Sequence, residues 1–146
     1  MVRLLMHSQL NEATMKIEYE LNSMPAKDWK TYSQAYVEGV FRIYILDELY
    51  LEESGFLLAE FASVLKRWFK ETQNDNNSDF VYESMDSDEA PILSFKNNGC
   101  GFIIKSVWER FECDVVLDKS RVLEKLNSFV EELSEQLESD LGISLS

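Results

Sequence analysis

Two hydrophobic periods occur along this chain, and together they limit the folds that it can adopt. Ile17, Tyr19 and Leu21 alternate with charged residues, which is the period of two expected for a half-buried strand. Beyond Asp118 the apolar residues recur with the longer period of an amphipathic helix. Both periods occur within 146 residues, so the sequence predicts a single α+β domain.

The predicted C-terminal helix has a start, an apolar stripe and an end. Asp118 is the expected N-cap, and Gly142 the expected C-terminal end. The stripe consists of Val122, Leu126, Phe129, Val130, Leu133, Leu137 and Leu141. The outer face carries Glu124, Glu131, Glu132, Glu135, Glu138 and Asp140. This acidic face is either a solvated surface or the contact surface for a basic partner.

A second helix is predicted from Ser54 to Lys70, with Ser54 as its N-cap. Its apolar stripe consists of Leu57, Phe61, Val64, Leu65 and Trp68. Lys66 and Arg67 precede Lys70 near the C-terminal end, where positive charges interact favourably with the helix dipole. The pattern predicts a helix that packs on a sheet.

The stretch from Val37 to Ser54 predicts a β-hairpin. Directly opposed residues share a face, so Ile45 can lie opposite Leu51 only if the connection has an odd number of residues. A two-residue turn would also lack the Gly or Asn that tight turns prefer. We therefore expect a connection of roughly three or five residues, with Leu46 opposite Tyr50.

The second face of this hairpin is a candidate docking surface. It is expected to carry Arg42, Tyr44, Tyr50 and Glu52, with Tyr44 opposite Glu52. Trp108, near the end of a later strand, is a further candidate. Tyr, Trp and Arg are enriched at binding hot spots, although cross-strand Tyr and Arg–Glu pairs also stabilise a sheet in water.

Further strands are predicted at residues 79–85, 91–95 and 101–108. The sequence Asn97-Asn98-Gly99 tolerates positive φ angles and predicts a tight hairpin. Residues 101–116 form either one strand or two. The complete prediction is an antiparallel β-sheet of about five to seven strands, with both helices packed on one face.

The domain is predicted to span residues 15–146, preceded by a poorly ordered extension at residues 1–14. The extension lacks the apolar core and cleavage site of a secretion signal, and no segment is long enough to span a membrane. Cys100 and Cys113 have neither metal-site nor CxxC spacing, so both are expected to be reduced. These features predict a cytoplasmic protein.

The charge balance restricts the choice of partner. The chain has 27 acidic and 14 basic residues and a net charge of −13. Nucleic acids and anionic lipid surfaces attract basic proteins, so neither is expected as a partner. A basic protein is favoured, because the electrostatic field would accelerate its approach.

The residue inventory argues against catalysis. His7 is the only histidine, so Ser-His-Asp or Cys-His catalysis and histidine-based zinc sites are not expected. Asp86, Asp88 and Glu89 share a predicted loop, but glycoside hydrolysis or cation binding needs carboxylates that converge from separate elements. We expect no enzyme activity, metal or cofactor, and assign these carboxylates to partner binding.

One resemblance rests on structural residues, in the succession FRIYILDELYLEE, FASVLKRWF, VYESMD, ILSF and IKSVWERFE, closed by the acidic helix. From Met15 onward the chain resembles a small uncharacterised protein family of Bacillus-like bacteria. Small acidic α+β proteins of this kind also resemble the immunity proteins that bacteria encode beside polymorphic toxins. This implies a non-enzymatic inhibitor of a basic toxin. A homodimeric structural protein and a small carboxylate-based enzyme or ligand-binding domain remain alternatives.

Overall fold

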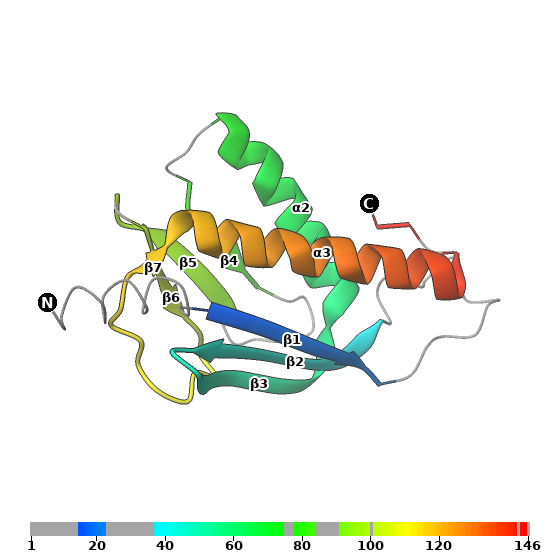
Figure 1. The fold of residues 1–146 in the computed structure, drawn as a ribbon, viewed down its shortest axis with the longest axis horizontal. Helices are drawn as coiled ribbons and strands as arrows, with labels where there is room; N and C mark the ends of the chain where they lie inside the picture. The colour runs from blue at the N-terminus through cyan, green and yellow to red at the C-terminus, as the bar shows by residue number, and fades with distance from the viewer. Residues whose placement is uncertain are drawn as a thin grey trace, which may run out of the picture.

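The computed structural model describes residues 15–22, 37–74, 78–83, 91–99, 101–142 and 144–145. Within these residues, seven strands form two antiparallel sheets, and two helices contact both of them (Figure 1). The predicted α+β class is therefore confirmed, with the strands divided between a three-stranded and a four-stranded sheet. The extension predicted at residues 1–14 lies outside the described residues.

The first sheet has the strand order β1-β2-β3. Its strands are β1 (Met15–Leu21), β2 (Glu38–Ile45) and β3 (Glu48–Leu57). The alternation predicted for β1 is confirmed, because Ile17, Tyr19 and Leu21 pack against the core while Lys16 and Glu20 are exposed. One face of this sheet is therefore buried and the other is open.

The turn between β2 and β3 has two residues, so the predicted odd-numbered connection is wrong. Ile45 pairs with Glu48 across Leu46 and Asp47. The φ angles of Leu46 and Asp47 are 52° and 67°. Positive φ at both central residues fits a type I′ turn, whose twist matches that of the flanking strands.

A β-bulge at Tyr50 provides the change of parity that the apolar pattern requires. Tyr44 pairs with Leu49, and Ile43 with Leu51, so Tyr50 is the extra residue of β3. Leu51 therefore shares the buried face with Ile43. The predicted alignment of Leu46 with Tyr50 is wrong because the turn ends before Tyr50.

The helix predicted to begin at Ser54 starts later, as α2 (Leu58–Asn74). Ser54 is not its N-cap, because β3 continues through Gly55, whose φ angle is 71°, to Leu57. The Leu58 N–H then donates to the Val37 carbonyl at 3.0 Å. The backbone up to Leu57 pairs with β2, so it is not available to form helical hydrogen bonds, and the helix begins only at Leu58.

The second sheet has the order β4-β5-β6-β7. Its strands are β4 (Phe80–Tyr82), β5 (Leu93–Asn97), β6 (Gly101–Lys105) and β7 (Leu117–Asp118). In the β5–β6 turn Gly99 has a φ angle of 93°, and Asn97 Oδ1 accepts from its N–H at 2.8 Å. Residues 101–116 therefore contain one strand, and the irregular segment 106–116 leads to the separate β7.

The C-terminal helix α3 (Lys119–Leu141) agrees with the prediction at both ends. Asp118 caps it by accepting from the Arg121 N–H at 3.0 Å, and Gly142 ends it with a φ angle of 67°. The apolar stripe from Val122 to Leu137 is buried. The side chain of Leu141 and the predicted reduced state of Cys100 lie outside what the structure describes.

A single aromatic cluster joins the elements. The buried ring of Phe61 on α2 lies 5.2 Å from Phe41 on β2 and 5.0 Å from Tyr82 on β4, between ring centroids. It also lies 5.3 Å from Phe56 on β3 and 5.7 Å from Phe129 on α3. The two sheets therefore share one hydrophobic core.

Cys113 is buried and free of disulfide bonds.

The turn conformation predicts the effect of a glycine at Asp47. This exposed residue holds a left-handed conformation that glycine adopts more readily. Asp47→Gly should raise the free energy of unfolding by about 0.5–1 kcal/mol, because it relieves backbone strain. Asp47→Ala, the matched control, should lower it by about 1 kcal/mol. Urea denaturation measures both, and equal destabilisation by the two variants would contradict the assigned turn.

Candidate functional site

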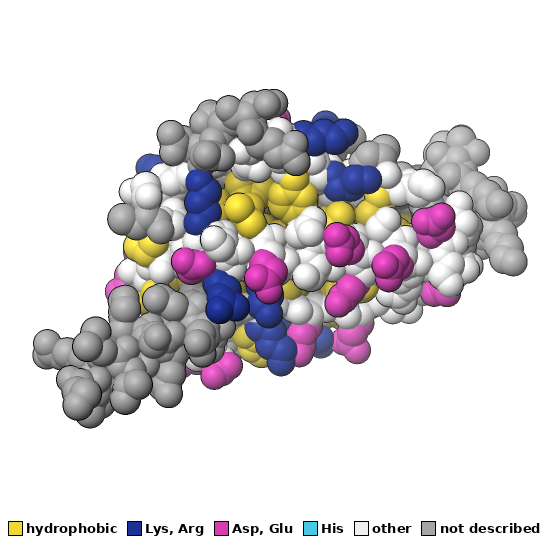
Figure 2. Space-filling view, turned by 45° about the horizontal axis from the view of Figure 1, so that its top comes forward, with side chains coloured by type: hydrophobic (Ala, Val, Ile, Leu, Met, Phe, Trp, Pro, Cys, Tyr) yellow, Lys and Arg dark blue, Asp and Glu magenta, His cyan; other side chains and the backbone are white. Residues whose placement is uncertain are grey.

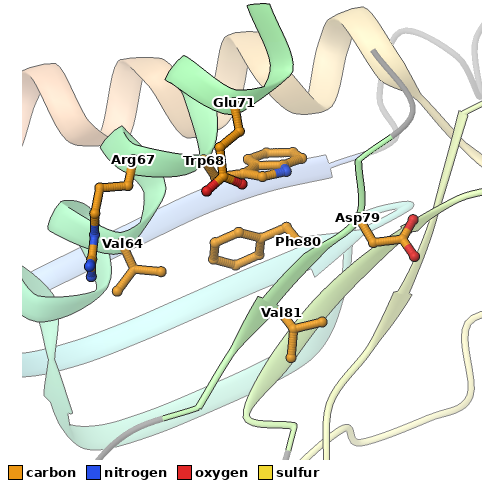
Figure 3. Close-up of a pocket in the computed structure, with 7 residues that line it drawn as sticks. All are labelled: Val64, Arg67, Trp68, Glu71, Asp79, Phe80 and Val81. Carbon is orange, nitrogen blue, oxygen red and sulfur yellow. The ribbon is translucent and has the colours of Figure 1, made fainter. Parts of the chain in front are cut away.

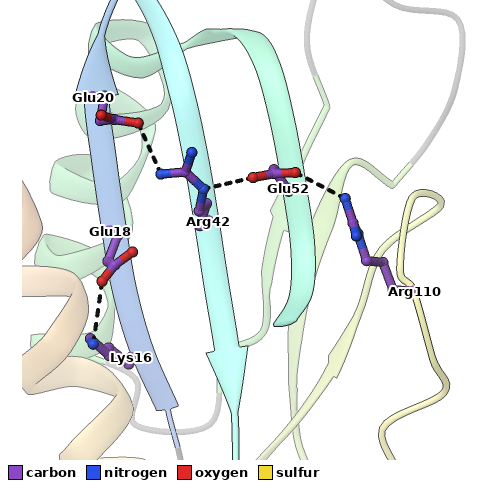
Figure 4. Close-up of polar contacts among 6 residues, drawn as sticks. All are labelled: Lys16, Glu18, Glu20, Arg42, Glu52 and Arg110. Carbon is purple, nitrogen blue, oxygen red and sulfur yellow. Dashed lines mark hydrogen bonds and ion pairs between the residues drawn. The ribbon is translucent and has the colours of Figure 1, made fainter. Parts of the chain in front are cut away.

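The open face of the first sheet carries a row of four charged side chains that runs across the strands (Figure 4). Arg42 Nη1 donates to Glu20 Oε2 at 3.0 Å, and its Nε donates to Glu52 Oε2 at 2.7 Å. Arg110 Nη2, from segment 106–116, donates to the other oxygen of Glu52 at 3.0 Å. We call Glu20, Arg42, Glu52 and Arg110 the sheet network.

The sheet network neutralises its own charges. The hydrogen bond from Arg42 lowers the pKa of Glu52, and the same bond raises the pKa of Arg42. The side chain of Arg42 is only 24% exposed because it lies between the two carboxylates. Arg42 and Glu52, two of the residues predicted to dock a partner, are therefore already paired with each other within the sheet.

Tyr44 lies on the same face and has its own partner. It pairs across the strands with Lys16, whose Nζ lies 5.6 Å from the centre of the Tyr44 ring. Lys16 also forms a 3.3 Å ion pair with Glu18. The predicted alignment of Tyr44 with Glu52 is wrong, because the two-residue turn places Leu49 opposite Tyr44.

Tyr50 was expected on the open face, and the structure contradicts this. Its exposed fraction is 0%. Its hydroxyl donates to Glu109 Oε1 at 2.6 Å, and its carbonyl accepts from the Arg110 N–H at 2.8 Å. Burial and the nearby Glu109 carboxylate raise the pKa of Tyr50 well above its ordinary value. Segment 106–116 covers Tyr50, so Tyr50 fixes the sheet to that segment and offers no surface to a partner.

Trp108 belongs to the same covering segment. Its backbone N–H donates to Ser106 Oγ at 3.0 Å, and its partly buried side chain packs against the core. Trp108 therefore packs the segment against the core, while Tyr50 joins the segment to the hairpin. Sequence periodicity could not indicate this contact, because an irregular segment has no period.

The predicted acidic cluster of Asp86, Asp88 and Glu89 lies outside the described residues. Within the described ranges, no three His, Cys, Asp or Glu side chains lie close enough to hold a metal ion. None of the helices in those ranges combines the length and apolar character needed to cross a bilayer.

A second charged surface lies on α3. From Asn127 to Leu141 the helix contains carboxylates and no Lys or Arg. These are Glu131, Glu132, Glu135, Glu138 and Asp140, which we call the acidic strip. All of them are exposed, and Figure 2 shows Asp and Glu side chains gathered along the C-terminal half of the helix.

The acidic strip is not compensated in the way that the sheet network is. Among the residues that the structure describes, none of its carboxylates forms an ion pair. Glu131 accepts a hydrogen bond from the neutral Asn127 amide at 3.3 Å. Like charges on adjacent turns repel each other, so this surface gains from a basic partner.

A groove of about 330 Å³ lies between β1 and α3 and is lined at one point by Glu132 of this strip. Tyr19 and Ile17 form part of its strand wall, and Phe129 and Glu132 part of its helix wall. The Tyr19 ring meets Phe129 edge to face at a centroid distance of 5.4 Å. Burial and then the charge of Glu132 raise the pKa of Tyr19. The groove thus provides partly apolar surface next to the carboxylates.

The fold and these surfaces define an α+β protein with a self-compensated sheet face and an uncompensated acidic helix. A family model matches residues 14–139, and the chain belongs to that family, which is described as Domain of unknown function (DUF7878). This match confirms the prediction of an uncharacterised family. No curated protein and no solved structure gives a significant match.

The sheet network predicts an unusual titration for Glu52. Its pKa should lie below the ordinary value of 4.5, because Arg42 stabilises the carboxylate. The unfolded chain binds this proton at higher pH, so the stabilisation is present above about pH 4.5 and is lost as pH falls through the folded pKa. NMR titration of side-chain carboxyl carbons measures this value. Arg42→Met should raise it, and an unchanged value would contradict the assigned pairing.

The acidic strip predicts a stabilising substitution at the end of α3. The last turn contains no basic residue, although the helix dipole favours positive charge there. Glu138→Lys should therefore raise the free energy of unfolding by about 0.3–1 kcal/mol. Glu131→Lys makes the same charge change farther from the end and should have a smaller effect in urea denaturation. An equal effect would identify overall charge, not the dipole, as the cause.

Proposed function

We propose that this protein is a non-enzymatic binding module that uses the acidic strip of α3 to bind a basic protein. The observation that carries this proposal is the row of exposed carboxylates without ion pairs in the described part of the chain. The net charge of −13 acts in the same direction, because its long-range field accelerates the encounter with a basic partner.

The strip is favoured over the sheet network as the contact surface. A partner that bound Arg42 or Glu52 would first have to separate hydrogen-bonded ion pairs of 2.7–3.0 Å. A partner that binds the strip replaces only water and counter-ions around exposed carboxylates. Electrostatic gain without loss of existing pairs supports the helix as the binding element.

The helix also presents its carboxylates in a fixed arrangement. Glu131, Glu135 and Glu138 follow the spacing that places side chains on one helical face. At 1.5 Å per residue they span about 10 Å along the axis. Capping by Asp118 and Gly142 and the buried stripe hold the helix in place. The partner therefore meets a rigid row of charges, which reduces the entropy lost on binding.

The partner class that fits this surface best is a basic toxin, which makes the protein an immunity-type inhibitor. Many enzymes that act on nucleic acids carry basic surfaces for phosphate groups. A row of carboxylates on a rigid helix can occupy such a surface in place of phosphates. This interpretation agrees with the small acidic α+β character of the chain.

The test measures association with the product of the neighbouring gene, first by co-purification and then by stopped-flow kinetics. The variant Glu131→Lys, Glu135→Lys, Glu138→Lys should reduce the association rate constant by at least about tenfold. For the wild-type protein the rate constant should fall by a similar factor between low salt and 0.5 M salt, because salt screens the exposed charges.

The matched control reverses three exposed carboxylates outside α3, by Glu48→Lys, Glu83→Lys and Asp114→Lys. This variant has the same net charge as the first but keeps the strip, so its rate constant should stay much closer to the wild-type value. An equal reduction of the association rate constant in both variants would show that net charge, and not the acidic strip, controls association. A salt-independent association rate would remove the electrostatic proposal altogether.

A further inference from the structure

A pocket of about 310 Å³ lies between α2 and the beginning of β4, away from the acidic strip (Figure 3). Its apolar wall is formed by Val64 and Trp68 of α2 and by Phe80 and Val81 of β4. The volume is at the lower end of the range of small-molecule sites. Val81 is 54% exposed, so one side of the pocket presents apolar surface to water.

The indole nitrogen of Trp68 is an unpaired donor in this wall. Trp68 is 3% exposed, and its Nε1 is buried without a hydrogen-bond partner among the described residues. Buried indole N–H groups usually have a partner, and leaving one unpaired costs about 1–3 kcal/mol. In Figure 3 the nitrogen lies on the side of the ring nearer to Asp79 than to Arg67. Among the residues that the structure describes, none supplies an acceptor to this nitrogen.

Charged groups at the rim limit the chemistry of that acceptor. Glu71 and Asp79 both line the pocket, while Arg67 lies beside Val64 at the other end (Figure 3). One oxygen of Asp79 accepts from the Asn97 N–H at 2.8 Å, and a carboxylate has acceptor capacity beyond one bond. Two carboxylates repel an anion, so an anionic acceptor is disfavoured. They favour a ligand that also donates hydrogen bonds.

We propose that this pocket binds a small apolar carboxamide. The carboxamide oxygen accepts from Trp68 Nε1–H, and its amino group donates to Asp79. Its apolar body lies against Phe80 and Val81. Nε1 is out of contact with solvent, so binding requires side chains that line the pocket to move, and we assign this movement to the exposed Glu71. One neutral group thus supplies an acceptor for Trp68 Nε1–H and donors for the Asp79 carboxylate.

This site is independent of the proposed binding of a basic protein. Its residues belong to α2 and to the start of β4, whereas the strip belongs to the second half of α3. Failure of either proposal leaves the other unaffected.

The test uses benzamide as the probe and benzoate as its matched anion, in ¹H–¹⁵N NMR spectra of the intact protein. The chain has three Trp residues, so the indole region contains few signals, and the Trp68 signal is assigned by its loss in Trp68→Phe. Benzamide should shift the Trp68 indole signal saturably, with a dissociation constant on the order of millimolar for a ligand of this size. Benzoate should bind at least about fivefold more weakly.

Two variants separate the hydrogen bond from simple apolar contact. Trp68→Phe keeps an aromatic ring without the donor, and it should weaken benzamide binding at least about fivefold while the spectrum stays that of a folded protein. Glu71→Ala removes one carboxylate and should narrow the difference between benzamide and benzoate, which tests the charge argument even if Trp68→Phe does not fold.

Three results would overturn the proposal. The first is a Trp68 indole signal that does not move with benzamide. The second is equal binding of benzoate and benzamide to the wild-type protein. The third is unchanged benzamide affinity in folded Trp68→Phe.

Discussion

The ring of Phe61 lies where both sheets and the C-terminal helix meet, and the rest of the structure depends on this contact. Neither sheet could bury its apolar face alone, because three or four short strands leave one side open to water. Phe61 contacts aromatic rings from β2, β3, β4 and α3, so the two sheets share one core. The sheet network and the acidic strip lie on the outer sides of elements that pack on this core.

Two charged surfaces on one core have opposite characters, and charge pairing explains the difference. On the sheet, Arg42 lies directly opposite Glu52 on β3 and diagonally from Glu20 on β1, so neighbouring strands supply both of its partners. On α3, the carboxylates from Glu131 to Asp140 follow one another along a stretch, Asn127 to Leu141, that contains no Lys or Arg. The sheet face thus contributes to the structure, while the helix keeps its charge available for a partner.

The correct and incorrect sequence predictions differ in the distance over which their signals act. Asp118 and Gly142 mark the ends of α3 because a cap bonds within a few residues of itself. The parity argument for the hairpin correctly required Leu51 to share the face of Ile43. That argument placed the additional residue of the hairpin in the turn, whereas the structure has it in β3, as the bulge at Tyr50. The covering segment around Glu109 lies far from Tyr50 in sequence, so no local pattern indicated it.

The sequence by itself determined the α+β class, the extent of α3, its acidic outer face and the alternation of β1, because each depends on periods and caps within one segment. Tertiary structure alone decided the division into two sheets, the burial of Tyr50, the late start of α2 and the pocket beside Trp68. These depend on which distant residues meet. The physical reason is that burial depends on contacts between distant parts of the chain. The elements that pack over a side chain such as Tyr50 or Trp68 are far from it in sequence, so no local pattern specifies them.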